Sequence, residues 1–261
     1  MNGTVNRRRR LVTRARIRAV LLVWAVGSTL WLANSMRTRG VGDDVMRSTE
    51  AVSVQEGATT LQFVPVSSSH RVGLIFFCGS GVGARAYAPL LRPIAEAGYA
   101  VFVVKLPYRF APLDAHREEA IDRARTVMAA HPDIPRWTIA GHSLGGAIAA
   151  RMARADPGAV SALVLMGTTH PKDIDLSLLQ MPVTKIYATN DGVAPAERIL
   201  ANKQLLPPAT KWVSIAGGNH SQFGHYGHQL FDGTASISRD AQQAVVRSAL
   251  LESLASISQH P

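Results

Sequence analysis

The fold is decided by the stretch Gly141-His142-Ser143-Leu144-Gly145-Gly146. An apolar run, 137–140, precedes it, and small helix-forming residues follow it over 147–152. This order predicts a strand, a sharp turn that carries Ser143, and a helix. Gly141 and Gly145 leave room where the strand and the helix approach closely, because larger side chains would clash there. A G-x-S-x-G pattern recurs by chance in many proteins, so its meaning depends on the rest of the chain.

The chain around this turn alternates apolar, strand-like runs with helical stretches. We expect strands near 61–66, 72–78, 99–104, 137–140, 162–167, 184–188 and 211–216, and helices near 86–97, 114–131, 194–205 and 236–257. Such alternation predicts an α/β fold, in which a mostly parallel sheet is flanked by crossover helices. We expect one catalytic domain over 59–261, after a linker over 41–58 that leads into an edge strand.

The charge of the chain is concentrated at its N-terminus. The formal net charge is +10, from 28 Lys and Arg against 18 Asp and Glu. Nine of the arginines lie in residues 1–40, which hold no acidic residue, so the rest of the chain has 19 basic against 18 acidic residues. A nearly neutral domain does not have the basic surface that nucleic-acid binding requires.

The N-terminal segment also contains a hydrophobic helix. Residues 19–36 carry no charge, and 18 helical residues span about 27 Å, close to the ~30 Å hydrocarbon core of a bilayer. The arginines before this segment predict a cytoplasmic N-terminus and a domain outside the cytoplasmic membrane. Two interpretations remain open: an uncleaved signal anchor, or a signal peptide that is removed at the small residues of Ala33-Asn34-Ser35. The protein is therefore expected to be membrane-anchored or secreted.

A serine at such a turn becomes a nucleophile only if a base takes its proton and an acid orients the base. Asp191 follows the predicted strand 184–188, and His220 follows the predicted strand 211–216, each one tight turn after the strand end. Because carboxyl ends of parallel strands meet at one edge, we expect Ser143, Asp191 and His220 to form a catalytic triad. The alternative acids are Asp173 and Asp175, and the alternative bases are His142, His170, His225 and His228.

Acyl transfer also needs backbone N–H donors that face the developing oxyanion. We expect one donor from Leu144, at the start of the helix after the turn. The other is expected from the glycine-rich loop after the strand 72–78, most simply from Ser80, with Gly79 or Gly81 as alternatives. Cys78, the only cysteine, is expected to be a buried apolar residue, and one cysteine cannot form an intrachain disulfide.

Together these motifs resemble the α/β-hydrolase family, in particular small serine esterases and dienelactone-hydrolase-like proteins. The matching stretches are Phe77–Gly81, Gly141–Gly146, Thr189–Gly192 and Gly217–His220. The resemblance implies an α/β-hydrolase fold and hydrolysis of esters by Ser143, Asp191 and His220 through an acyl-enzyme. Cys78 departs from the family pattern, since many relatives carry His there. The short connection between the strands 162–167 and 184–188 predicts a minimal lid and an open site.

The leading hypothesis is thus a serine esterase that needs no metal or cofactor and acts on a small or lipid-like ester. No His, Cys, Asp and Glu grouping has metal-ligand spacing. The expected partners are the ester and, through the N-terminal helix, a membrane, with no nucleic acid. Acyl transfer on the same scaffold and a non-catalytic, membrane-anchored binding protein are the alternatives.

Overall fold

The computed structural model describes residues 2–67 and 70–258. Its centre is an eight-stranded sheet in the order β1-β2-β4-β3-β5-β6-β7-β8. β1 and β2 pair antiparallel, β2 pairs antiparallel with β4, and all other neighbours are parallel. The strands are β1 Val52–Glu56, β2 Thr60–Pro65, β3 Val72–Phe77, β4 Ala100–Val104, β5 Arg136–His142, β6 Ala162–Met166, β7 Val183–Ala188 and β8 Lys211–Ile215. The predicted mostly parallel sheet is confirmed.

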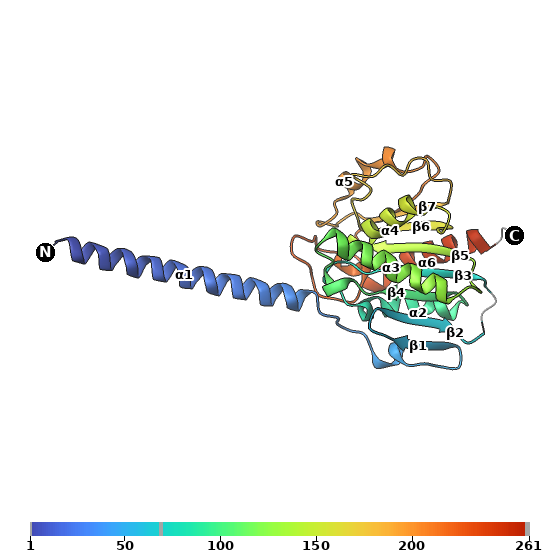
Figure 1. Ribbon diagram of the computed structural model, residues 1–261, viewed down its shortest axis with the longest axis horizontal. Helices are drawn as coiled ribbons and strands as arrows, with labels where there is room; N and C mark the ends of the chain where they lie inside the picture. Colours follow the sequence, from blue (N-terminus) through green and yellow to red (C-terminus); the bar gives the residue numbers. More distant parts are fainter. Residues whose placement is uncertain (1, 68–69, 259–261) are drawn as a thin grey trace.

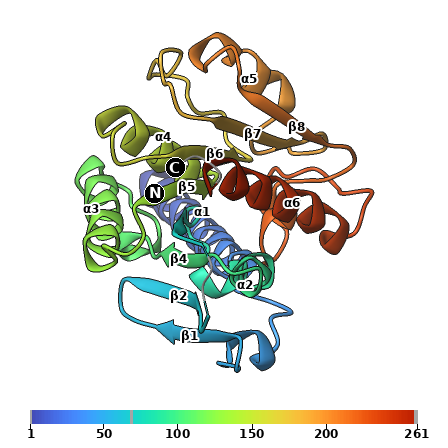
Figure 2. The same cartoon turned by 90° about the vertical axis from the view of Figure 1, so that its right-hand side faces the viewer.

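Helices cover both faces of the sheet (Figure 1). α2 packs with α6 on one face and α3 with α4 on the other, so the domain has three layers (Figure 2). The helices are α1 Asn2–Ser35, α2 Ala88–Glu96, α3 Asp114–Ala130, α4 Leu144–Ala155, α5 Ala196–Leu200 and α6 Arg239–Ser258. The core lies between these layers, and every residue of β3, β4 and β6 is buried. Burial on both faces explains why these strands read as continuous apolar runs.

Two segments differ in detail from the sequence-based expectation. Val52–Glu56, inside the predicted linker 41–58, forms the edge strand β1, since Val52 is fully buried and the strand pairs with β2. The helix expected over 194–205 is divided into α5 and a short 3-10 turn at Lys203–Leu205. Between them the Asn202 side chain donates to the carbonyls of Thr169 and Arg198.

The connection between β6 and β7, residues 167–182, contains no helix and no strand. A minimal lid is therefore confirmed. The carboxyl ends of the parallel strands β3 to β8 meet at one edge of the sheet, which we call the carboxyl edge. Loops after these strand ends are the usual place for an active site in open α/β sheets.

α1 projects from the domain as an isolated rod (Figure 1). Its segment Thr13–Ser35 is 23 residues long with a mean hydropathy of 1.4 in its most apolar window, no residue of which is buried. It is long and apolar enough to cross a membrane, a property that a signal sequence near the N-terminus shares.

Candidate active site

Ser143 lies at a strained turn between β5 and α4. Its φ of 55° and ψ of −119° fall in a region that side-chain-bearing residues rarely adopt. Its N–H donates to the carbonyl of Met166 at 3.0 Å, which fixes the turn against β6. A side chain at Gly145 would clash with the backbone of Phe77, and one at Gly141 would clash with Gly145. The two glycines therefore let α4 start directly on the sheet, with Ser143 at its N-terminus.

Asp191 and His220 form a buried acid–base pair at the same edge. His220 Nδ1 lies 2.8 Å from Asp191 Oδ2, and the two side chains are 1% and 0% exposed. The other carboxylate oxygen, Oδ1, accepts the N–H groups of Val193 at 2.9 Å and Ala194 at 2.6 Å. These donors orient Oδ2 toward the imidazole. A carboxylate facing Nδ1 favours the tautomer in which Nδ1 carries the proton and Nε2 is an acceptor.

The structure brings Asp191 and His220 into contact, and it places His142, next to Ser143, against them. The ring centroids of His142 and His220 are 4.5 Å apart. His220 Nε2 is buried without a hydrogen-bond partner among the described residues, so it makes no bond to Ser143 here. Hydrogen bonds between nucleophile and base are often long in ligand-free sites and tighten with substrate.

The N–H groups near Ser143 divide into occupied and free donors. Gly79 donates to the Tyr87 hydroxyl at 2.9 Å, and Gly81 donates to the carbonyl of Arg109 at 2.7 Å. Within the described part of the chain, the N–H groups of Ser80 and Leu144 make no hydrogen bond. Of the candidate oxyanion donors, Gly79 and Gly81 are thus engaged, whereas Ser80 and Leu144 remain available.

His142 belongs to a network behind the site. Its Nδ1 lies 2.9 Å from the Tyr87 hydroxyl. Burial, and then the neighbouring His220, hold the pKa of His142 well below its usual range, and burial raises the pKa of Tyr87 well above its usual range. Both side chains are therefore neutral at pH 7. The Tyr87 hydroxyl thus links His142 to the N–H of Gly79, the residue before Ser80.

Apart from His142, the alternative acids and bases have other partners or are exposed. Asp173 pairs with His170 at 3.2 Å, and Asp175 accepts the N–H of Ser177 at 2.8 Å. Neither contacts His220. His225 accepts the Arg39 N–H through its carbonyl, while His228 is exposed. No group of three His, Cys, Asp or Glu side chains in the described ranges could hold a metal ion.

Asp232 is a residue that sequence reasoning missed. Its carboxylate accepts the N–H of His220 at 3.0 Å, the N–H of Ser221 at 2.8 Å and the Ser221 hydroxyl at 2.6 Å. It also lies 3.3 Å from the N–H of Gly192, next to Asp191. Asp232 therefore connects the loop that carries His220 to the loop that carries Asp191 by hydrogen bonds. Its place in a turn before Gly233 was the only available signal.

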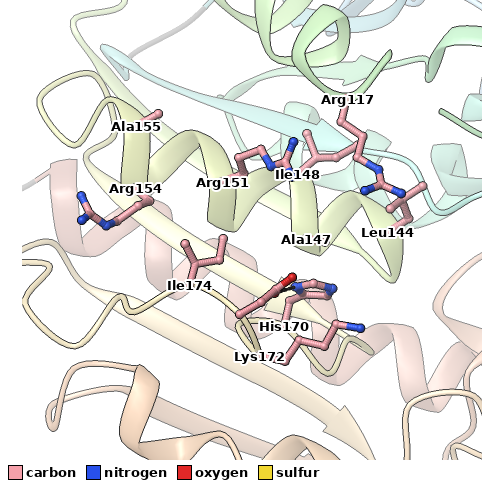
Figure 3. Close-up of a pocket in the computed structure, with 11 residues that line it drawn as sticks. Arg117, Leu144, Ala147, Ile148, Arg151, Arg154, Ala155, His170, Lys172 and Ile174 are labelled. Atoms are coloured by element: carbon pink, nitrogen blue, oxygen red, sulfur yellow. Dashed lines mark ion pairs between the residues drawn. The ribbon is translucent and has the colours of Figure 1, made fainter. Parts of the chain in front are cut away.

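A groove of about 560 Å³ opens beside Leu144 (Figure 3). α4 forms one wall with Ile148 and Arg151, and the loop with His170 and Lys172 forms the other. Four basic side chains and one acidic side chain line it, namely Arg117, Arg151, Arg154, Lys172 and Asp173. Ion pairs with Asp114 and Glu118 neutralise Arg117 and Arg151 in part. Within the described chain, Lys172 and Arg154 make no ion pair, so the groove is net basic.

Lys185 supports this groove from the core, and it predicts a pH dependence of stability. It is 1% exposed, and its Nζ donates to the carbonyl of His170. Burial lowers the pKa of Lys185 from 10.5 to about 7. Between these two pH values the unfolded chain binds more protons than the folded one, so the free energy of unfolding rises with pH.

Replacing Lys185 by methionine is expected to remove that rise. We would measure urea unfolding in detergent between about pH 8 and pH 10. The free energy of unfolding of the wild type should rise by roughly 1.4 kcal/mol per pH unit relative to that of Lys185→Met. The comparison with the variant cancels the titration of other groups. A difference between the two proteins that stays constant with pH would contradict the buried, neutralised lysine.

Comparisons with known proteins agree with this architecture. The profile of the alpha/beta hydrolase family matches residues 73–244. A predicted CIB-like hydrolase from Thermoplasma acidophilum superposes with a TM-score of 0.61 at 14% identity, over 77% of this chain and 99% of that one. A ferulic acid esterase from Streptomyces cinnamoneus gives 0.60 at 20% identity, over 76% and 72%.

A serine hydrolase without lid from Xanthomonas campestris is also similar, with a TM-score of 0.55 at 16% identity over 83% of this chain and 99% of that one. At such identities these neighbours establish the fold alone. No match was found among curated proteins. The family profile spans well over half of the sequence, including the Ser143 turn, Asp191 and His220. This chain belongs to the alpha/beta hydrolase family.

Proposed function

We propose that this protein is a serine esterase, which hydrolyses carboxylic esters through an acyl-enzyme formed on Ser143. The observation that carries the proposal is the buried 2.8 Å contact between His220 and Asp191, at the sheet edge where Ser143 stands at a strained turn. A buried carboxylate held on the far side of a histidine from a serine is the arrangement that activates a hydroxyl nucleophile. Esterases among the structural neighbours are consistent with the proposal.

In the proposed reaction, Ser143 Oγ attacks the ester carbonyl while His220 Nε2 accepts its proton. Asp191 holds Nδ1 and stabilises the imidazolium that forms. His220 then donates the proton to the leaving alcohol, and a water molecule deprotonated by His220 cleaves the acyl-enzyme. His220 gives this second proton to Ser143 Oγ as the carboxylic acid leaves, so base and nucleophile both return to their starting states and the cycle needs no metal or cofactor.

The negative charge that develops on the carbonyl oxygen needs donors that are already in place. We assign the N–H groups of Leu144 and Ser80 to this role, because neither has a partner in the described chain. Gly79 is left out, since its N–H is bound to Tyr87. The positive end of the α4 dipole adds to the stabilisation at Leu144.

The proposed location is outside the cytoplasmic membrane, with α1 as an uncleaved anchor. The nine arginines of residues 1–40 and the absence of acidic residues there favour a cytoplasmic N-terminus. The segment Thr13–Ser35, 23 residues long, is long and apolar enough to span the bilayer, and no residue of its most apolar window is buried.

A fluorophosphonate probe tests the nucleophile directly, because it reacts with an activated serine. Full-length protein in detergent is expected to be labelled at Ser143, and Ser143→Ala is expected to prevent labelling. Ser80→Ala is the matched control, since it removes an exposed hydroxyl near the site but keeps the backbone N–H. Absence of labelling in folded wild-type protein would favour the non-catalytic alternative.

The basic groove predicts a preference for esters with a negative charge at the far end of the acyl chain. Lys172 and Arg154 carry the charges that no ion pair in the described chain neutralises. In the double variant Lys172→Gln/Arg154→Gln, we expect the ratio of kcat/KM for a carboxylate-terminated ester over its neutral analogue to fall about fivefold. Two p-nitrophenyl esters of equal length measure this ratio. A ratio equal to that of the wild type would show that the acyl chain does not enter the groove.

A further inference from the structure

α1 is joined to the domain without a spacer. Ser35 and Met36 are buried, and Met36 packs against Gly81 in the loop that carries Ser80. Thr38 then forms a β-bridge with Tyr226, and the next residue, Arg39, donates its N–H to the carbonyl of His225 at 2.9 Å. The last turn of α1 is therefore fixed at the carboxyl edge, beside the candidate active site. Figure 2, viewed nearly along α1, shows the rod behind the middle of the sheet.

This attachment determines where the domain lies if α1 spans a bilayer. The charge-free part of α1, residues 19–35, is about 26 Å long, close to the ~30 Å hydrocarbon core, and Arg14, Arg16 and Arg18 come directly before it. The apolar segment continues to Ser35, so the membrane surface lies at the level at which α1 enters the domain. With no free residue between helix and domain, the carboxyl edge cannot stand away from that surface.

The composition of this edge fits contact with lipid. Three segments form the surface around the root of α1, namely 33–41, 106–113 and 225–231. They contain Arg37, Arg39 and Arg109 and no Asp or Glu. Five of their large apolar side chains are exposed and form what we call the apolar rim: Tyr108, Phe110, Leu113, Leu230 and Phe231. Aromatic and basic residues without acidic ones are typical of a membrane–water interface.

The apolar rim adjoins both α1 and the candidate site. Leu230 lines an apolar cavity together with Trp24, Trp31 and Leu32 of α1. The carbonyl of Phe110 accepts the Ser80 hydroxyl at 3.4 Å. On the other side, the Phe231 backbone lies against Gly192, which follows Asp191. The rim thus flanks the oxyanion side and the acid–base side of the site.

We propose that the apolar rim is a membrane-contact surface, which opens the active site onto the bilayer, and that the substrate is an ester of a membrane-resident amphiphile. This inference rests on the proposed function, both for the anchor α1 and for ester cleavage at Ser143. It assigns an orientation of the domain and a route for the substrate, which reaches Ser143 along the lipid surface. Contact with lipid also explains why two large aromatic side chains are exposed: Phe231 is 81% and Tyr108 is 78% exposed.

Site-specific fluorescence tests the contact without reference to activity. Cys78 is buried, and burial raises the pKa of its thiol to about 12, so an introduced cysteine is labelled selectively. We would attach an environment-sensitive fluorophore to Phe110→Cys and Leu230→Cys in the full chain. Val66→Cys is the control, because Val66 is 61% exposed and follows β2 at the opposite edge of the sheet. Leu22→Cys reports on α1 itself.

In vesicles of phosphatidylcholine and phosphatidylglycerol, the labels at 110 and 230 are expected to shift to shorter wavelength. Nitroxide-bearing lipids should quench them, whereas the label at 66 should be unaffected. If the label at 22 is quenched while those at 110 and 230 behave like 66, α1 is an anchor but the membrane-contact surface is wrong. If the label at 22 is not quenched either, the anchor and the inference fail together.

A second measurement concerns the substrate. Tyr108 and Phe231 have φ angles of 53° and 67°, so asparagine, which tolerates this region, can replace them with the loops preserved. For Tyr108→Asn/Phe231→Asn we expect the activity ratio between a vesicle-embedded long-chain ester and a soluble short-chain ester to fall about fivefold or more. An unchanged ratio would overturn the lipid route, and loss of both activities in the Ser143→Ala control establishes that the ratio reports on this site.

Discussion

Replacing Ser143 by alanine is expected to lower kcat for a soluble p-nitrophenyl ester by roughly 10⁵-fold or more, which is the scale of losing a serine nucleophile. The fold should persist, because the N–H of residue 143 still donates to Met166 and no glycine contact changes. Kinetics of purified full-length protein measure the loss. Retention of even a tenth of the wild-type rate would show that another group performs the attack.

Ser143→Gly adds a test that separates catalysis from stability. Residue 143 has φ 55° and ψ −119°, where a side chain strains the backbone and glycine does not. We expect Ser143→Gly to be as inactive as Ser143→Ala but more stable by about 1 kcal/mol in urea unfolding. Equal stability of the two variants would contradict this prediction, since relief of strain would then not exceed the entropy that glycine adds to the unfolded chain. The comparison matters because both variants lack the hydroxyl and differ only in the Cβ atom, which the positive φ strains.

Much of the fold followed from local patterns in the sequence. Strands buried on both faces, such as β3 and β4, appear as continuous apolar runs, and the crossover helices appear between them. The limits of β1 were harder to predict because only one of its residues, Val52, is fully buried. An edge strand with exposed polar positions has little pattern to distinguish it from a linker.

The candidate site was predictable where a residue follows a strand directly. Asp191 and His220 each come one turn after a strand end, and parallel strands bring such ends together, as their 2.8 Å contact shows. Asp232 lies 12 residues beyond His220, in a loop whose path depends on tertiary packing, so no local pattern reveals its bond to the His220 N–H. The same holds for Tyr87, whose contact with Gly79 decides which N–H groups stay free.

Asp191→Asn is expected to lower kcat by about 10⁴-fold with the fold intact, for a reason visible in the hydrogen bonds of Asp191. The N–H groups of Val193 and Ala194 both donate to Oδ1, so an asparagine at this position must keep its carbonyl oxygen there. Its NH₂ group then takes the place of Oδ2 and faces His220 Nδ1. Nδ1 must become an acceptor, which moves the imidazole proton to Nε2, and His220 can no longer accept a proton from Ser143.

Asp232→Asn is the matched control, because it removes a carboxylate that holds the backbone of His220 rather than its ring. Both oxygens of Asp232 accept N–H groups, so an amide there faces a donor and loses at least one hydrogen bond. We expect Asp232→Asn to reduce stability by about 1–3 kcal/mol and kcat far less than Asp191→Asn does. Kinetics and urea unfolding of both variants decide the matter. Each carboxylate lies within hydrogen-bonding distance of His220. A large loss of kcat in Asp191→Asn alone would therefore identify the imidazole tautomer as the cause. Equal losses in both variants would mean that Asp191, like Asp232, only holds the loop of His220 in place.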